Sequence, residues 1–312
     1  MFSINDYDLS YVYALQLLNA GLPVIYERVN MVSDPDSPSY DVTVENMYSY
    51  LSGTCFSVEG HLADRGLRIK YLTTGGYPVY EYDMPISSDT TSPGAIATQM
   101  IKLCSVRGDC VALIDHTNNP ARPLTGVNSV FGILNGRGRF PIIDEQDTYA
   151  SMFTPWANYS ITRLPDKSTM QLPASFGYLL SLAKSLKTNS NWLAIAGVAR
   201  GKVPTLISLN TDDTLTNAIA DGYQLSDSEN MYGSSLNAIT NINGYGYCIW
   251  GNRTLRQSSP NRQGTATGYL NLRNMVSDIK KLAFASAQRL LFEQNTDMLW
   301  LTFKSYMNPL LS

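Results

Sequence analysis

The decisive sequence reads GYGYCIWGNRTL at residues 244–255 and, after a short polar gap, YLNLRNMVSDIKKLAFASAQRLLFEQNTDMLW at residues 269–300. The first stretch is a glycine-flanked aromatic run that predicts a strand over residues 245–250, followed by a turn. The second stretch predicts one long amphipathic helix over residues 272–295. Neither stretch concentrates a catalytic residue type, so this part of the chain indicates an assembly element rather than an active site.

The predicted long helix carries one apolar stripe and an opposite, mostly basic face. The stripe consists of Leu272, Met275, Val276, Ile279, Leu282, Ala283, Ala287, Leu290 and Leu291. The charged side chains opposite are those of Arg273, Asp278, Lys280, Lys281 and Arg289. We expect the stripe to pack on the core of the subunit itself and the basic face to remain free for partners.

The rest of the chain alternates predicted strands and helices, which favours an α/β fold with a mixed sheet flanked by helices. Helices are predicted over residues 6–20, 95–104, 127–134, 174–186 and 214–220, with a close-packed loop or helix start over 191–200. Strands are predicted over residues 23–29, 111–115 and 148–159, the last running into a Pro-Trp corner. We place the α/β core at residues 1–29 and 94–312. We interpret residues 30–93 as a partly β insertion with a hairpin over 67–82.

Composition narrows the class of protein. Charged residues make up 16% of the 312 residues, well below the ~25% of an average protein. The 20 tyrosines favour large contact surfaces, because Tyr combines apolar area with a polar tip. Ordinary β packing would also use them. The net charge of −3 without a basic run argues against nucleic-acid binding. We find neither a signal peptide nor a membrane-spanning run, and therefore expect a soluble protein made in the cytoplasm.

Candidate chemical sites are weak. The four cysteines form no C-x-x-C pair and only two histidines are present, so we predict no metal site. The glycines between 244 and 251 do not follow the dinucleotide-binding spacing and precede no helix. Asp115-His116 would be half of a hydrolytic triad, but no G-x-S-x-G accompanies it. The Arg107-Gly108-Asp109 tripeptide is interpreted as a helix-to-strand turn. We predict no catalytic residue and no cofactor.

Several segments, in the same order along the chain, resemble the contractile tail sheath proteins of bacteriophages and related injection machines. The segments are VALIDHTNNP (111–120), YASMFTPW (149–156), PAS (173–175), WLAIAGVARG (192–201), GYCIWGNRTL (246–255), YLNLR (269–273) and the FEQN run (292–295) with Trp300. The most specific part is the pair of motifs on either side of the predicted long helix. The resemblance covers about two thirds of the chain, mainly residues 95–311.

The residues that carry this resemblance are structural. They are Trp156, Trp250, Gly251, Arg253, Thr254, Arg273, Phe292, Glu293, Asn295 and Trp300. By similarity, Trp250 would anchor the core strand under the long helix. Arg253 and Thr254 would fix the turn, with Arg253 pairing to a carboxylate such as that of Glu293. The chain departs from the family at Ile195 and Gln294, which replace prolines, and at Asn274, which replaces an arginine.

The resemblance implies a subunit that polymerises helically around a tail tube and contracts to drive the tube through a target envelope. Implied partners are further copies of the subunit, the tube protein, and the baseplate and tail terminator proteins, with no nucleic acid and no membrane. The implied location is a virion tail assembled in the host bacterial cytoplasm. Family members continue with further strands and arms, so we expect the strand over 245–250 to lack partners within this chain.

Two alternatives stay open. The chain could be another tail component, such as a baseplate or tube-associated adaptor. It could also be an α/β hydrolase-like enzyme, which would require a pocket with convergent polar groups.

Overall fold

The computed structural model describes residues 9–24, 70–73, 100–101, 103–115, 147–161, 169–188, 192–210, 236–256 and 265–311. Within these residues, none of the helices combines the length and the hydropathy that a membrane crossing requires.

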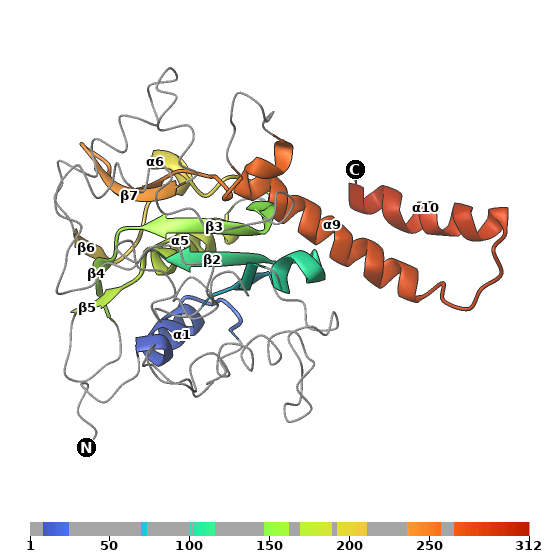
Figure 1. Ribbon diagram of the computed structural model, residues 1–312, viewed down its shortest axis with the longest axis horizontal. Coiled ribbons are helices and arrows are strands. Elements are labelled where there is room, and N and C mark those ends of the chain that lie inside the picture. The colour runs from blue at the N-terminus through green and yellow to red at the C-terminus, as the bar shows by residue number, and fades with distance from the viewer. Residues whose placement is uncertain are drawn as a thin grey trace, which may run out of the picture.

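A mixed five-stranded sheet forms the centre of the molecule (Figure 1). Its strands are β1 (Tyr71–Leu72), β2 (Val111–Asp115), β3 (Ala150–Thr154), β7 (Leu236–Ile242) and β8 (Gly246–Trp250), in the order β1-β2-β3-β7-β8. The first four run parallel, and β8 returns antiparallel to β7. A second, antiparallel sheet has the order β5-β4-β6, with β4 at Ala157–Ser160, β5 at Thr169–Leu172 and β6 at Leu206–Leu209. The predicted α/β fold with a mixed sheet is confirmed.

Helices α1 (Leu9–Asn19) and α5 (Ala174–Leu186) close the main core. The strands β2 and β3 are buried along their whole length, as the continuous apolar run of residues 111–114 predicts. Helix α5 packs on β2, β3 and β7, and α1 packs on α5. Aromatic contacts join these layers: the ring of Phe176 lies 5.3 Å from that of Tyr13 and 4.9 Å from that of Tyr159.

Among the described residues, the remaining helical segments are short or belong to the C-terminal region. They are η2 (Asp147–Tyr149), α6 (Gly197–Arg200), η3 (Ala266–Gly268), α9 (Leu270–Gln288) and α10 (Asp297–Leu311), with helical residues also between 100 and 107.

Several predicted elements are confirmed. Helix α5 has the predicted bounds, α1 ends at Asn19 before Gly21 in the left-handed region (φ 92°), and β2 has the predicted bounds. The Pro-Trp corner is a cis Thr154–Pro155 peptide between β3 and β4. Tyr71 and Leu72, which we assigned to the insertion, instead form β1 of the core sheet. The rest of the predicted insertion, and the predictions for 25–29, 127–134 and 214–220, lie outside the described residues.

The expectation that the strand over 245–250 lacks partners in this chain is wrong. Strand β8 pairs with β7 from Gly246 to Trp250 on one side. On its other side, the Tyr247 carbonyl accepts the Val203 N–H (3.0 Å), and the Ile249 N–H donates to the Gly201 carbonyl (2.8 Å). The segment after α6 therefore supplies the second neighbour that the sequence pattern did not reveal.

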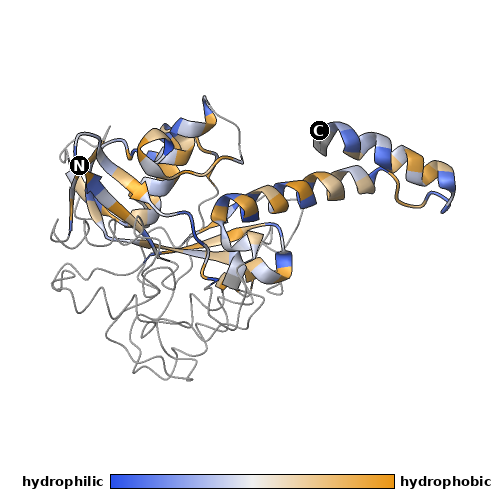
Figure 2. Cartoon of the chain, turned by 90° about the horizontal axis from the view of Figure 1, so that it is seen from above, coloured by the Kyte–Doolittle hydropathy of each residue, from blue (hydrophilic) through white to orange (hydrophobic). Residues whose placement is uncertain are grey.

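The single long helix predicted over 272–295 is also wrong. Helix α9 ends at Gln288, and after a turn α10 begins at Asp297 and runs back alongside α9 (Figures 1 and 2). The two helices form a hairpin, here called the C-terminal hairpin (residues 270–311), that projects from the body of the molecule. Most of the sequence resemblance that is specific lies in this hairpin and in the turn that precedes it.

Candidate functional site

The turn over residues 250–255 holds the first turn of α9. Helix α9 has no side-chain cap of its own at Tyr269. Instead the Asn252 carbonyl accepts the Leu270 N–H (3.0 Å), and the Asn252 side-chain oxygen lies 3.3 Å from the Asn271 N–H. The Asn252 amide also donates to the Asn271 side-chain oxygen (2.6 Å). These contacts satisfy backbone groups that a helix start leaves open, so the turn determines where the hairpin begins.

Asn237 of β7 fixes this turn from inside the sheet. Its fully buried side-chain amide donates to the carbonyl of Arg253 (2.8 Å) and to the Ser151 hydroxyl (2.8 Å), and its oxygen accepts the Arg253 N–H (2.8 Å). Gly251 is required here, because a Cβ at this position would lie 2.7 Å from the Asn237 side-chain oxygen. Sequence analysis missed Asn237, since it predicted no strand over residues 236–242 and a single Asn carries no distinguishing signal.

The side chains of the turn residues serve local packing. The Arg253 guanidinium lies 4.6 Å from the centre of the Tyr269 ring. Thr254 is fully buried, and its backbone N–H donates to the Gly268 carbonyl (3.0 Å). Trp250 is half-buried at the end of β8. Arg253 and Thr254 thus both contact the segment that leads into α9.

The suggested pairing of Arg253 with Glu293 within one chain is wrong. Arg253 lies at the start of α9, where it bridges to Tyr269, whereas Glu293 follows the end of the helix. A helix of 19 residues is about 28 Å long at 1.5 Å per residue. No side-chain ion pair spans that distance.

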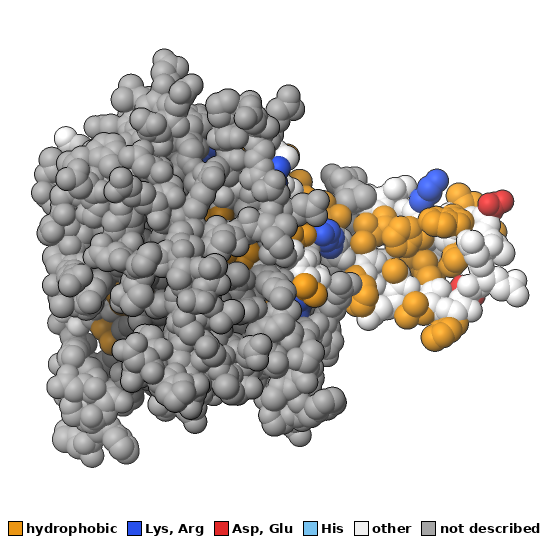
Figure 3. Space-filling view, in the orientation of Figure 1, with side chains coloured by type: hydrophobic (Ala, Val, Ile, Leu, Met, Phe, Trp, Pro, Cys, Tyr) orange, Lys and Arg blue, Asp and Glu red, His pale blue; other side chains and the backbone are white. Residues whose placement is uncertain are grey.

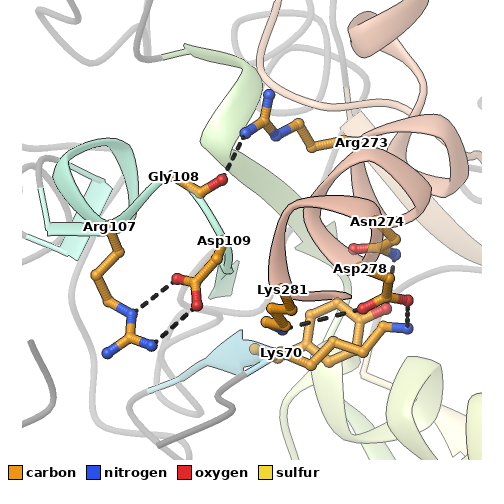
Figure 4. A network of polar contacts seen from close by, with 9 residues as sticks. Lys70, Arg107, Gly108, Asp109, Arg273, Asn274, Asp278 and Lys281 are labelled. Atoms are coloured by element: carbon orange, nitrogen blue, oxygen red, sulfur yellow. Dashed lines mark hydrogen bonds and ion pairs between the residues drawn. The ribbon is translucent and has the colours of Figure 1, made fainter. Parts of the chain in front are cut away.

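Arg273 attaches α9 to the body of the molecule (Figure 4). Its side chain is buried, and the guanidinium carbon lies 3.6 Å from the centre of the Tyr149 ring. The guanidinium also donates to the Gly108 carbonyl (3.3 Å). Lys280, two turns further along the same face of α9, donates to the same carbonyl (3.2 Å). A cation held over an aromatic ring and away from water makes a stronger contact than an exposed one.

The turn that contacts these cations is itself held by a buried ion pair. Arg107 and Asp109 are both buried and form a two-bond ion pair with each other (2.9 and 3.1 Å). Gly108 between them has a φ of 71°, which presents its carbonyl to α9. The interpretation of this tripeptide as a helix-to-strand turn is confirmed.

A second group of contacts joins the same helix to the edge of the sheet. The Lys70 ammonium lies 2.8 Å from the Asp278 carboxylate, and Lys281 lies 3.9 Å from it (Figure 4). The Asn274 amide donates to the Tyr71 hydroxyl (2.7 Å). Partial burial lowers the pKa of Lys281, while the neighbouring Asp278 opposes that shift. Helix α9 is therefore bound to β1 and to the turn before β2 through polar side chains.

The expected orientation of α9 is consequently reversed. Its buried residues are Leu270, Arg273, Asn274 and Ser277, which recur at helical spacing and form one mostly polar face. At 100° per residue the predicted apolar stripe lies roughly opposite, and its members are half-buried or exposed. The physical reason is that the body offers a backbone carbonyl, a carboxylate-bearing turn and tyrosine rings, which suit Arg and Asn better than Leu. Arg273 is not available to a partner, and Lys280 and Lys281 already have contacts within the chain.

The tip of the C-terminal hairpin gathers the other signature residues. Phe292 is fully exposed, and its φ of 70° places it in the left-handed region. The Trp300 indole N–H donates to the Asn295 side-chain oxygen (3.0 Å). Glu293 is exposed. Figure 3 shows hydrophobic side chains spread over this end of the hairpin.

Buried polar groups elsewhere belong to the core. The Asp115 carboxylate at the end of β2 accepts the Ser175 N–H (2.7 Å) and the Ser175 hydroxyl (2.6 Å), and Tyr13 contacts that hydroxyl (2.8 Å). Burial raises the pKa of Asp115 to about 7. Ser175 is completely buried, so the group joins α1, β2 and α5 rather than facing a substrate. His116 lies outside the described residues.

Other candidate positions are likewise internal. Trp156 is buried beside the cis peptide, and its carbonyl accepts the Asn210 N–H (2.8 Å). Cys104, Cys110 and Cys248 are buried free thiols. Among the described residues, no three His, Cys, Asp or Glu side chains are grouped so that they could hold a metal ion.

Comparisons with known proteins agree with this geometry at the level of the fold. No model of a protein family matches the sequence, and no curated protein matches it. Twenty-four chains of solved structures match. One, from the cryo-EM structure of the anti-feeding prophage (AFP) baseplate, sixfold symmetrised, has a TM-score of 0.54 and 13% identity, and the match covers 100% of this chain and 66% of that chain.

Two other matches come from contracted sheaths. A chain of the PVC extracellular contractile injection system sheath has a TM-score of 0.43 and 18% identity, covering 68% of this chain and 51% of that one. A chain of the AFP helical sheath has a TM-score of 0.41 and 16% identity, covering 72% and 51%. The present chain thus spans about half to two thirds of the length of the solved chains. The match with a TM-score of 0.54 shows that this fold occurs in a contractile injection system.

Proposed function

We propose that this chain is a structural subunit in the tail of a contractile injection machine, and specifically a sheath subunit. It would polymerise helically around a tail tube and contract to drive the tube through the envelope of a target cell. The observation that carries the proposal is the fold, which the chain shares along its whole length with a chain of the AFP baseplate structure. The sequence motifs on either side of α9 add independent support, because their residues build the base and the tip of the C-terminal hairpin.

The geometry suits a protein that works through contacts between chains. A projecting hairpin gives one copy a surface that reaches beyond its own core (Figure 1). When such a surface contacts a different surface on the next copy, each added copy leaves a free surface for another. The copies then form a closed ring or an open helical filament, depending on the rotation between them. Contraction then requires two alternative packings of the same subunits, with the energy stored in their interfaces at assembly. No cofactor takes part in this proposal.

The proposed partners follow from this role. They are further copies of the subunit, the tail tube protein, and the baseplate and tail terminator proteins. The proposed location is the tail, assembled in the cytoplasm of a bacterial host. In a bacteriophage this tail would belong to the virion and would serve genome ejection.

A baseplate component is the second candidate. The solved chain that matches all of the present one belongs to a baseplate structure, and this favours a position at the end of the tail as well as along it. The two roles differ in copy number: a sheath subunit is added along the tail, whereas a baseplate component is present in a fixed number.

A hydrolase-like activity is disfavoured by the burial of Ser175. The hydroxyl of Ser175 is bound to Asp115 and Tyr13, and the residue has no exposed surface. A nucleophile must reach a substrate in a plausible pose, so this serine is a core residue and not the first member of a triad.

Negative-stain electron microscopy of the purified full-length gene product tests the proposal. At increasing protein concentration we expect striated sleeves, or stacked rings with a central channel wide enough for a tube. A chain that remains a small, unassembled species at every concentration and hydrolyses ester substrates would contradict the proposal. Any observed hydrolysis is checked with Ser175→Ala. This variant must lose the activity if Ser175 is the nucleophile.

A further inference from the structure

The tip of the C-terminal hairpin exposes five large apolar side chains within eleven residues. They are Leu291, Phe292, Met298, Trp300 and Leu301, here called the tip surface, and each is more than half exposed. Phe292 has no surface covered at all, although its left-handed backbone conformation costs about 1 to 2 kcal/mol for a residue with a Cβ. A strained and fully exposed aromatic residue gains nothing within the subunit, so its position points to a contact outside it.

The tip surface is held in place before any partner binds. Asn295 accepts the only hydrogen-bond donor of the Trp300 indole (3.0 Å), so the indole needs no water or partner for its polar atom. The Thr296 hydroxyl accepts the Leu299 N–H (3.3 Å), which caps the first turn of α10. Both contacts join the residues just before α10 to its first turn. The apolar part of Trp300 is therefore presented in a fixed orientation, which lowers the entropic cost of binding.

The size of the tip surface matches one side of a protein interface. At about 200 Å² for each fully exposed side chain, the five residues present roughly 700 Å². The largest apolar patch on a typical monomer is about 300–600 Å². One partner in a stable complex contributes about 800 Å². With a modest polar rim, the tip surface has the area that such a complex needs.

The charges around the tip and the distribution of the other exposed apolar side chains favour a second copy of this chain as the occupant. The exposed charged residues around the tip are Arg289, Glu293, Asp297 and Lys304, two of each sign. Such a rim has no preference for a strongly charged partner but is complementary to itself. Elsewhere on the described residues, the most exposed large apolar side chains, such as Val106, Trp192 and Tyr245, belong to different segments. The matching surface in this part of the chain is thus the tip of another copy.

We propose that free subunits pair through their tip surfaces, with the two hairpins related by a twofold axis and Phe292 and Trp300 at the centre. Such pairing places the same patch on both sides of the contact. It covers in the unassembled protein an apolar surface that would otherwise favour aggregation. The pairing goes beyond the proposed tail function and does not depend on it.

Sedimentation velocity measurements on the full chain test the pairing, at about 1 to 100 µM and below the concentration at which larger assemblies form. We expect a reversible dimer that dissociates in the micromolar range. Trp300→Ala and Phe292→Gly should each raise the dissociation constant at least tenfold, as substitutions at the centre of an interface do. Phe292→Gly also relieves the left-handed backbone, so its thermal midpoint should not fall.

Trp192→Ala is the matched control, because Trp192 and Trp300 are both 57% exposed but only Trp300 belongs to the tip surface. This variant should change the dissociation constant less than twofold. A wild-type chain that stays monomeric at 100 µM overturns the proposal. An effect of Trp192→Ala equal to that of Trp300→Ala overturns it too. None of these results bears on whether the chain is found in tails, which is measured separately.

Discussion

Removal of the Arg273 side chain should detach the first half of α9 from the body of the molecule. The guanidinium is buried, stacks on Tyr149 at 3.6 Å and donates to the Gly108 carbonyl at 3.3 Å. In Arg273→Ala both contacts are lost together, and Gly108 loses one of its two donors from α9. The buried face of α9 is otherwise made of Leu270, Asn274 and Ser277, which cannot replace a cation.

The magnitude follows from the two contacts. A hydrogen bond from a charged group contributes about 1.5 to 3 kcal/mol, and a desolvated cation over an aromatic ring about 2 kcal/mol. Because one group makes both contacts, their values are not additive. We expect Arg273→Ala to lower the free energy of unfolding by about 2 to 4 kcal/mol.

Lys280→Ala provides the control, and Arg273→Lys separates charge from stacking. Lys280 donates to the same carbonyl at 3.2 Å, but it is exposed and lies 5.9 Å from the Tyr149 ring. Its removal should cost less than about 1 kcal/mol. Urea denaturation followed by circular dichroism measures all three variants at one pH. A loss of under about 0.5 kcal/mol for Arg273→Ala, or an equal loss for Lys280→Ala, would refute the reasoning.

Three further predictions concern the core. Asp115 has a pKa of about 7 in the folded chain against an ordinary 3.8, so its stabilising contribution is complete below pH 3.8 and is lost as the pH rises to 7. The free energy of unfolding of Asp115→Asn should therefore increase relative to wild type between pH 4 and 7, by up to roughly 4 kcal/mol in urea titrations. A difference that stays constant over this pH range would contradict the prediction. Gly177→Ala should lower the free energy of unfolding by about 1 to 3 kcal/mol despite the better helix propensity of Ala, because the new Cβ would lie 2.6 Å from the Tyr159 hydroxyl. In thermal melts, adding Tyr159→Phe should restore part of the lost stability. If it restores none, the loss comes from other neighbours of Gly177. Asn237→Ala should lower the free energy of unfolding by about 3 kcal/mol or more, because it leaves buried polar groups without partners. Asn241 is exposed on the same strand, so Asn241→Ala should change the free energy of unfolding by no more than about 0.5 kcal/mol in chemical denaturation. Similar losses for both variants would contradict the role of Asn237.

Local patterns in the sequence predicted much of the core correctly. The apolar run of residues 111–114 is a buried strand, and the apolar residues from 174 to 186 form α5 with the expected bounds. Both elements follow from side-chain spacing and burial on a single element. The mixed sheet follows from the alternation of such elements along the chain.

The candidate site was harder to predict because its polar contacts join distant segments. Periodicity found the apolar stripe of α9 but could not show that Arg273 would be buried against residues more than a hundred positions away. The break between α9 and α10 contains neither Gly nor Pro, the residues that usually signal such a break. The left-handed conformation is instead taken by Phe292. Thr296 followed by Asp297 was a readable start signal for a second helix. Asn237 gave no such signal, because its contacts join two strands and the turn after a third.

The central claim is that the chain is built into contractile tails along their length. The most direct measurement is the number of copies per particle, determined by quantitative mass spectrometry on purified tails separated by length. A sheath subunit predicts a copy number that rises in proportion to tail length. A copy number that is the same for short and long tails would contradict the sheath assignment in favour of a baseplate component, and absence of the chain from purified tails would contradict both.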